Sequence, residues 1–411
     1  MFASFFPRPK MFVWSAVGWF FLALLVWYGF ADGLAPQLSL MREAAEVAEG
    51  ERAPFLNPDK VWLYQYLVLA TFVFCIIWGF FDRNRWYGWA VWGSAVILLV
   101  TYFNVQIGVY LNTWYGEFFD LIQQALTDPG SVTLEEFFGQ LITVFNVLVP
   151  LIMVLVLLSY FTQHYVFRWR TAMNDYYMSN WTRLRDIEGA AQRVQEDTMR
   201  FAGIVEGLGS NFVSAIMTLI AFIPLLWTLS AQITELPFLG AVPGSLVFVA
   251  LISSIFGTVL LAAVGYKLPG LEFNNQKVEA AYRKELVFGE DSAERAQPMQ
   301  ITELYSSVRK NYFKLYFNYL YFNVFRYAYL QGANFVPLVA MAPTIVAGAI
   351  TFGTFQQINQ AFGRVENSFQ FLVNSWTTIV ELMSIHKRLR AFESRLDGDI
   401  TIDPAEPALQ M

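Results

Sequence analysis

The sequence of 411 residues has one cysteine and two histidines. So few Cys and His residues cannot build a Cys/His metal site, and a single Cys excludes an intrachain disulfide. Neither a G-x-S-x-G nucleophile motif nor a G-x-x-x-x-G-K-[ST] phosphate-binding loop is present. The longest segments expected in water have about 40 residues, too few for a separate nucleotide-hydrolysing domain. We therefore expect no enzyme, no catalytic residues, no metal, no cofactor and no nucleic-acid partner.

Apolar residues are abundant instead. They make up 56% of the sequence, whereas charged residues make up 15%, against about 25% in a typical soluble domain. Eight apolar stretches are each about 20 residues or longer, enough at ~1.5 Å per residue to cross a ~30 Å hydrocarbon core. They cover residues 11–31, 61–81, 88–112, 138–165, 206–230, 244–266, 319–350 and 357–380. The first stretch lacks a clear signal-peptide cleavage site, so we expect it to be a retained helix.

Positive charge is sorted between the two sides that these stretches define. With the N-terminus on one side, that side collects 22 of the 27 Lys and Arg residues, and the opposite side has only Arg42, Arg52 and Lys60. Arg326 and Arg364 lie within or at the ends of stretches. By the positive-inside rule, this asymmetry predicts a multi-pass protein of the lipid bilayer with both termini in the cytoplasm.

The two long cytoplasmic segments, 166–203 and 267–314, have the composition of helices. Residues 166–203 contain no Pro and two Gly, and residues 271–297 are also rich in helix formers. We therefore expect the fourth to seventh stretches to continue as helices beyond the bilayer. Opposite charges at i, i+4 spacing support this prediction: Arg193 with Asp197, Glu196 with Arg200, and Glu279 with Arg283.

The order of these segments resembles the transmembrane domain of ABC exporters. Without the first two stretches, six remain, with long cytoplasmic extensions between the second and third and between the fourth and fifth. The sequence EGAAQRVQEDTMRF (188–201) looks like a motif in the first cytoplasmic loop of peroxisomal-type ABC transporters. NNQKVEAAYRKELVFGED (274–291) is similar to their EAA-like motif. No ATP-binding domain follows the last stretch.

A more specific resemblance covers nearly the whole sequence, and it is strongest from 160 to 395. The segments at 1–9, 164–181, 187–202, 267–291, 308–317 and 374–393 resemble the SbmA/BacA family of peptide-antibiotic transporters. This resemblance implies a homodimer in the bacterial inner membrane with an ABC-exporter-like fold. It also implies import of antimicrobial peptides and peptide-like antibiotics by alternating access, driven by protons rather than ATP.

We therefore expect an all-α membrane protein with about eight transmembrane helices per chain. Residues 1–87 would form two additional N-terminal helices with an extracytoplasmic loop, 88–385 the ABC-exporter-like core, and 386–411 a short cytoplasmic tail. Two other functions stay open. The chain could be the transmembrane subunit of an ABC transporter with a separate ATPase chain, docked through the motif at 279–285. A lipid-modifying membrane enzyme would need a clustered His/Asp or Cys site, which the sequence does not suggest.

Glu206 is the first candidate for proton coupling. Carboxylates in a partly dry cavity suit this role, because desolvation favours their neutral form. Glu206 has no basic residue within four positions, and Gly203, Gly207 and Gly209 around it would allow close helix approach. The alternative is a solvated carboxylate at a helix end.

Glu272, Glu279 and Glu290 are further proton-coupling candidates. Their intervals of 7 and 11 residues return to nearly the same helical face. On a continuous helix they would form an acidic column leading inward. The alternative is a structural helix in which these acids pair with Arg283 and Lys284.

The ABC-like motifs contribute a second group, which we expect to hold the cytoplasmic loops together. This structural group comprises Arg193, Glu196, Asp197 and Arg283.

A polar stripe follows the last apolar stretch at steps of three and four residues: Gln356, Gln360, Gly363, Asn367, Gln370, Asn374, Thr378 and Glu381. Another face is apolar: Phe362, Val365, Phe369, Leu372, Trp376 and Ile379. Amides facing lipid would be left unpaired. We expect the stripe to line a substrate cavity, where amides can pair with a peptide backbone of any sequence. A buried hydrogen-bond seam between helices is the alternative.

Tyr312, Tyr316 and Tyr319 recur at i, i+4 and i+7 just upstream of the seventh stretch. We expect Tyr316 and Tyr319 to join the substrate cavity, where their rings could stack on proline or apolar cargo. A membrane-interface belt explains them equally well.

Overall fold

The computed structural model of the protein describes residues 1–41, 58–187, 189–237, 240, 242–292, 294–394 and 396. Within these ranges the ordered elements are helices, and an isolated bridge joins Leu236 to Gly240. Arg42, Arg52 and the tail beyond 396 lie outside the described residues. The chain forms two compact units. Unit 1 comprises Met1–Leu111, Leu134–Ser214 and Glu381–Met411, and unit 2 comprises Asn112–Thr133 and Ala215–Val380.

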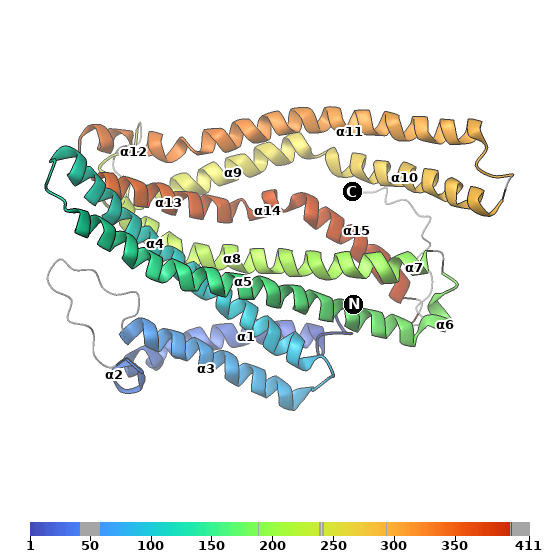
Figure 1. Ribbon diagram of the computed structural model, residues 1–411, viewed down its shortest axis with the longest axis horizontal. Helices are drawn as coiled ribbons and strands as arrows, with labels where there is room; N and C mark the ends of the chain where they lie inside the picture. Colours follow the sequence, from blue (N-terminus) through green and yellow to red (C-terminus); the bar gives the residue numbers. More distant parts are fainter. Residues whose placement is uncertain are drawn as a thin grey trace. The chain divides into compact units, whose positions relative to one another are not determined.

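Unit 1 holds the N-terminal helices, α5 and the first part of α8 (Figure 1). Its elements are α1 (Pro9–Val26), η1 (Trp27–Ala31), η2 (Asp32–Leu34), α2 (Ala35–Leu38), α3 (Pro58–Phe81), η3 (Gly88–Gly93), the start of α4 (Ser94–Thr127), α5 (Leu134–Ser179), α6 (Trp181–Leu184), α7 (Ala190–Gln192), η4 (Arg193–Asp197), the start of α8 (Thr198–Ser230) and most of α15 (Trp376–Glu393).

Unit 2 is built around helices from the second half of the chain. Its elements are the ends of α4 and α8, α9 (Ser245–Gly265), α10 (Leu268–Asp291), α11 (Pro298–Ala333), α12 (Val336–Val346), α13 (Phe352–Phe369), α14 (Phe371–Asn374) and the start of α15. Within this unit α10 and α11 run side by side as a long hairpin, and α9 packs against both α11 and α13 (Figure 1).

Seven helical segments of the described chain are long and apolar enough to cross a membrane, which confirms the predicted all-α membrane fold. They are Pro9–Leu34, Lys60–Phe81, Gly88–Thr127, Leu134–Ser179, Ala190–Ser230, Ser245–Gly265 and Pro298–Val346. They correspond to the first seven predicted stretches. The eighth stretch, 357–380, does not qualify, because its chain breaks at Gln370 and Ser375 into three shorter helices and its polar stripe lowers its hydropathy.

The helical extensions of the cytoplasmic segments are present. α5 continues for 46 residues to Ser179, and α10 and α11 cover most of 267–314. Between α5 and α8 lie the short elements α6, α7 and η4, because the chain turns at Asn180 and again at Gly189, whose φ is +76°. That backbone conformation is in the left-handed region, which glycine adopts without a Cβ penalty.

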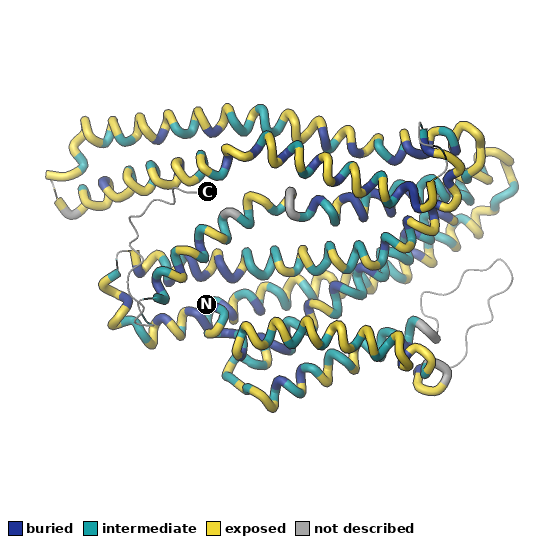
Figure 2. The backbone as a smooth tube through the Cα atoms, turned by 180° about the vertical axis from the view of Figure 1, so that it is seen from behind, coloured by how far each residue is buried: buried dark blue, intermediate teal, exposed yellow. Residues whose placement is uncertain are grey.

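Exposed residues are frequent along the described helices (Figure 2), and many of them are large and apolar. α1 has no buried residue, and only 6% of the most apolar window of Leu134–Ser179 is buried. Exposed residues of α5 include Phe145, Met153 and Val156. Apolar surface of this extent is a liability in water and the expected solvent-facing surface in lipid.

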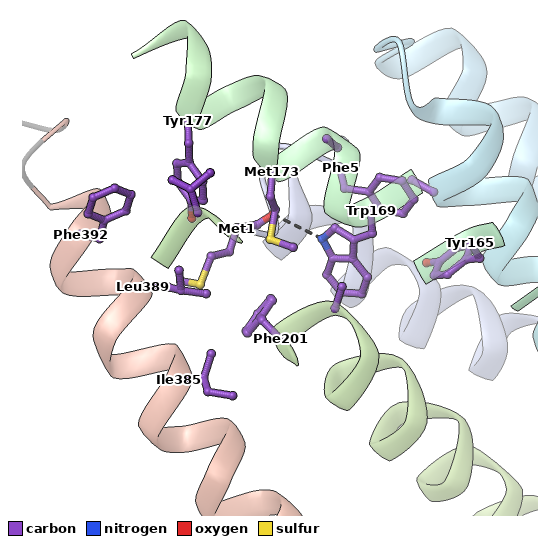
Figure 3. Close-up of a cluster of buried hydrophobic side chains, with 14 of the residues drawn as sticks. Met1, Phe5, Tyr165, Trp169, Met173, Tyr177, Phe201, Ile385, Leu389 and Phe392 are labelled. Carbon is purple, nitrogen blue, oxygen red and sulfur yellow. Dashed lines mark hydrogen bonds between the residues drawn. The ribbon is translucent and has the colours of Figure 1, made fainter. Parts of the chain in front are cut away.

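An aromatic cluster in unit 1 joins α5, α8 and α15 (Figure 3). From α5 it takes residues four positions apart, which share one helical face: Tyr165, Trp169, Met173 and Tyr177. Its other buried members include Met1, Phe5, Phe201, Ile385, Leu389 and Phe392. Phe201 belongs to α8, so this packing fixes the start of the helix that carries Glu206 five residues later.

In unit 2 the first turn of α13 packs tightly on the end of α4. The Gly353 N–H donates to Asp120 Oδ1 (2.7 Å), and the Phe352 N–H donates to Gln123 Oε1 (2.7 Å). The Thr351 hydroxyl accepts from the Thr354 N–H (3.1 Å). Three backbone donors of this region, which a helix start would otherwise leave unpaired, are thereby satisfied, two of them by side chains of α4.

We expect Gly353→Ala to destabilise the protein by ~1–3 kcal/mol, because overpacking of a tight contact costs about that much. A Cβ at Gly353 would overlap the backbone oxygen of Gly116 and the carboxyl group of Asp120. Gly363→Ala in the same helix is the control, since a Cβ there meets no atom within 4 Å. Thermal unfolding in detergent measures both variants, and an equal effect of the two would contradict the tight contact.

Candidate functional site

Glu206 lies in α8 as a half-buried residue. Within the described part of the chain its carboxylate makes no hydrogen bond or ion pair. It lies close enough to the Tyr165 hydroxyl of α5 to interact with it electrostatically, and that hydroxyl is 2.8 Å from the Ser94 hydroxyl. Glu206 is therefore a carboxylate without a hydrogen bond or ion pair among the described residues, in an apolar helix and within electrostatic reach of the Tyr165 hydroxyl.

The expected close helix approach at the glycines around Glu206 is wrong for the single chain. A Cβ at Gly203, Gly207 or Gly209 would meet no atom within 4 Å. The helix surface beside Glu206 is open there, because the neighbouring helices pack on Phe201 and Ala202 instead. Open space leaves room for water, substrate or another helix.

The three acids of α10 lie on one unbroken helix, as the acidic column requires. Glu272 and Glu279 are half-buried and Glu290 is exposed. Glu272 Oε1 accepts a hydrogen bond from the Tyr319 hydroxyl of α11 (2.8 Å). Glu279 forms no ion pair with Arg283 among the described residues, and Arg283 is exposed.

The ABC-like motif of the first cytoplasmic segment makes an ionic cluster with α15, both within unit 1. The Arg388 guanidinium donates to both carboxylate oxygens of Asp197 (2.7 and 3.0 Å), and these hydrogen bonds raise the pKa of Arg388 above its ordinary value. Arg200 pairs with Glu196 (3.0 Å) and Glu381 (3.4 Å). Together these contacts tie the start of α8 to the last helix.

Two predictions about this motif need correction. Asp197 pairs with Arg388 rather than with Arg193 at i−4, because residues 193–197 form a π-helical turn that changes the i, i+4 register. The Arg193 guanidinium lies over the Phe392 ring instead (5.6 Å). Arg283 takes no part in the cluster, since it is an exposed residue of α10 in unit 2.

The polar stripe does not follow one continuous helix, which corrects the expected arrangement. Its residues are divided among α13, α14 and α15. Gln370 is buried and its amide donates to the Tyr329 hydroxyl, so this position forms a hydrogen-bond seam. Glu381 belongs to unit 1, in the ion pair with Arg200. Of the other cavity candidates, Gln356 and Gln360 are half-buried, and Asn367 and Asn374 are exposed.

The two cavity tyrosines also have different surroundings. Tyr316 is 57% exposed, and its ring lies 5.5 Å from that of Tyr312. Tyr319 is half-buried and bonded to Glu272, so it connects one cavity candidate with one proton-coupling candidate. Only Tyr316 is free to stack on a ligand from outside the α10–α11 hairpin.

Sequence reasoning missed Glu366. This residue of α13 is 7% exposed, and its Oε1 accepts a hydrogen bond from the Ser253 hydroxyl of α9 (2.8 Å). The available signal was that Glu366 is the one carboxylate between residues 357 and 380. A carboxylate in an apolar stretch is a functional hypothesis by default. It was overlooked because it lies off the amide stripe, next to Val365 of the apolar face.

Metal binding finds no support in the part of the chain that the structure describes, where no group of three or more His, Cys, Asp and Glu side chains could hold an ion.

The helices and their exposed apolar surfaces define the class of protein as an all-helical, multi-pass membrane protein. The model of the SbmA/BacA-like family matches residues 83–397. The chain therefore belongs to the SbmA/BacA-like family. The match begins at the connection before the third span and includes both cytoplasmic segments and most of α15.

Curated relatives carry names from ABC transport. The chain is 24% identical over 336 residues to the "Inner membrane ABC transporter ATP-binding protein YddA" of Escherichia coli (strain K12), covering 75% of this chain and 58% of that protein. It is 26% identical over 270 residues to "ABC transporter D family member 2, chloroplastic" of Arabidopsis thaliana, covering 61% and 36%. The chain thus spans about half the length of the curated relatives it matches.

Proposed function

We propose that this protein imports antimicrobial peptides and peptide-like antibiotics across the bacterial inner membrane, by alternating access and with the proton gradient as the driving force. Family membership supports peptide transport, and the printed name of the Escherichia coli relative supports an inner-membrane location. The observation that carries proton coupling is Glu206, a half-buried carboxylate without an ion-pair partner among the described residues, on an apolar helix.

Proton coupling at Glu206 follows from its surroundings. A hydrated cavity favours the carboxylate, and a closed, dry cavity favours the neutral acid. A proton taken up from the side with higher proton concentration would allow the cavity to close, and hydration on the other side would release it. The acids of α10 would extend the route, with Glu272 linked to Tyr319 and Glu290 exposed at the far end of the helix.

The translocation pathway would be shared by two copies of the chain. A chain with an ABC-exporter-like core of six helices provides half of a pathway, so we propose a homodimer with two-fold symmetry. In the single chain, the surface of α8 at the glycines near Glu206 is not covered by other atoms, which leaves space for a partner or for cargo. The charge asymmetry of the sequence supports termini in the cytoplasm.

A second candidate function is the transmembrane subunit of an ABC transporter with a separate ATPase chain. The names of the relatives favour it, since they are ATP-binding proteins and are longer than this chain.

Uptake into membrane vesicles depleted of ATP separates the two functions. With an inwardly directed proton gradient, we expect a labelled proline-rich peptide to accumulate at the same rate with and without ATP, and a protonophore to stop it. A rate that depends on ATP and is insensitive to the protonophore would favour the ABC subunit.

A further inference from the structure

A buried hydrogen-bond cluster in unit 2 joins three helices around Glu366 of α13. Ser253 of α9 donates from its hydroxyl to Glu366 Oε1 (2.8 Å). The Tyr329 hydroxyl of α11 donates to the Ser253 carbonyl oxygen (3.1 Å) and accepts from the Gln370 amide. The Glu366 carboxyl group also lies close enough to the Tyr329 hydroxyl to interact with it electrostatically. Glu366, Tyr329 and Gln370 are 7%, 8% and 3% exposed, so the cluster is shielded within the unit.

Counting hydrogens in this cluster indicates where a proton resides. A tyrosine hydroxyl has a single hydrogen, and the Ser253 carbonyl oxygen takes it in this arrangement. The contact between Tyr329 and Glu366 then needs its hydrogen from the carboxyl group. A neutral Glu366 can donate to the Tyr329 oxygen while its other oxygen accepts from Ser253. An ionised Glu366 has no hydrogen to donate, so it would compete with the Ser253 carbonyl for the single hydrogen of the Tyr329 hydroxyl.

The charges around Glu366 also favour its neutral, protonated form. α9 and α12 contain no charged residue, and among the described residues Tyr329 is the titratable group that interacts with Glu366. Arg364 on α13 and Arg326 on α11 are the nearest cations along these helices. Both are exposed, and neither forms an ion pair in the described residues. A buried carboxylate without a cation is unfavourable, so the neutral acid is the form that this site stabilises.

Ser253 and Tyr329 of this cluster also line a cavity between α9 and α11. This cavity has a volume of about 310 Å³ and is lined by Ser253 and Tyr329 together with apolar residues such as Phe256 and Phe325. Ser253 and Tyr329 therefore contact both the cavity and the Glu366 carboxyl group. A proton that leaves Glu366 can pass toward this side of the cluster by way of the Tyr329 hydroxyl.

We propose that Glu366 is a proton-binding site of this transporter, loaded in the arrangement observed here and discharged through Tyr329 when α9, α11 and α13 separate. Discharge breaks the O–H bond of the carboxylic acid, transfers the proton to water and leaves a carboxylate. The transport role rests on the proposed function, whereas proton binding at Glu366 does not. Helix separation would hydrate the carboxylate and thereby couple its charge to the conformation.

Infrared spectroscopy of the purified protein tests proton binding without transport. A protonated carboxyl group gives a carbonyl band, separate from that of carboxylates, which shifts in D₂O. We expect this band near neutral pH in the wild type and its loss in Glu366→Gln. Gln at this position can still accept from Ser253 and donate to Tyr329, so the helix packing is kept. Tyr329→Phe should retain the band at a shifted frequency, because the acid loses a hydrogen-bond partner.

Glu303→Gln is the matched control, because Glu303 is an exposed residue of α11 and makes no hydrogen bond or ion pair within the described chain. It should leave the band unchanged. Absence of the band from the wild type, or an unchanged band in Glu366→Gln, would overturn the proposal.

Transport by the same variants tests the coupling role. We expect Glu366→Gln to lose gradient-driven peptide uptake in proteoliposomes while it still binds peptide. Driven uptake at the wild-type rate would overturn the coupling role. If the band belongs to Glu366 but the wild type shows no gradient-driven uptake, the proposed function fails and the proton-binding site stands.

Discussion

Glu206→Gln should abolish gradient-driven peptide uptake while expression and assembly stay near normal. The amide keeps the shape and most of the hydrogen-bonding capacity of the acid but cannot titrate. Glu206 is half-buried, next to the Tyr165 hydroxyl and without an ion-pair partner in the described chain, so its loss removes a charge change rather than a structural contact. Uptake driven by a pH gradient and equilibrium peptide binding, measured on the same preparation, separate coupling from cargo recognition.

Two further variants control this experiment. Glu206→Asp should retain part of the activity, because the acid is present but displaced by one methylene. Gly207→Ala adds a Cβ that meets no atom within 4 Å, so it should transport normally unless a partner or cargo occupies that space. Normal uptake by Glu206→Gln would show that Glu206 is a helix-end residue and would move the proton role to Glu279, Glu290 or Glu366.

Arg388→Ala should destabilise the protein by ~2–3 kcal/mol, the largest stability effect that we expect from a single side chain. The Asp197 side chain is 4% exposed and would lose the cation that donates to both of its oxygens. Arg388 is 42% exposed, and this solvent access keeps the cost below that of a fully buried pair. Thermal and denaturant unfolding in detergent measure the effect.

Arg200→Ala is the control for this ionic cluster. Its pairs with Glu196 and Glu381 join side chains that are at least a third exposed, so their loss should cost less than ~1 kcal/mol. Arg388→Lys should recover only part of the stability. Lysine keeps the positive charge, but its ammonium group cannot make the same two parallel hydrogen bonds. Equal effects of Arg388→Ala and Arg200→Ala would contradict a special role for the buried Asp197.

The sequence could predict the spans and the long cytoplasmic helices because these depend on local properties. In lipid, an apolar stretch of sufficient length must pair its backbone N–H and C=O groups within a helix, wherever the rest of the chain lies. The hairpin of α10 and α11 likewise follows from helix-forming residues on both sides of the turn before Pro298. Family membership was also predictable, because the resemblance rested on long motifs rather than on composition.

The site contacts depend on residues far apart in the sequence, and local patterns do not encode them. Asp197 and Arg388 are separated by 191 residues, and Ser253 and Glu366 by 113. The stripe of the last stretch was predicted from an unbroken helical period, but the chain breaks at Gln370, where the amide donates to Tyr329 of α11. The helical period predicted from the sequence thus ends where Gln370 makes a hydrogen bond to a distant helix.

The most direct test of the account is transport by the purified protein alone in liposomes with a pH gradient as the only energy source. We expect a labelled antimicrobial peptide to accumulate against its concentration gradient when the gradient is directed inward, and to equilibrate without accumulation when a protonophore collapses it. Accumulation that appears only with ATP and a second, ATP-hydrolysing subunit would contradict proton-driven import.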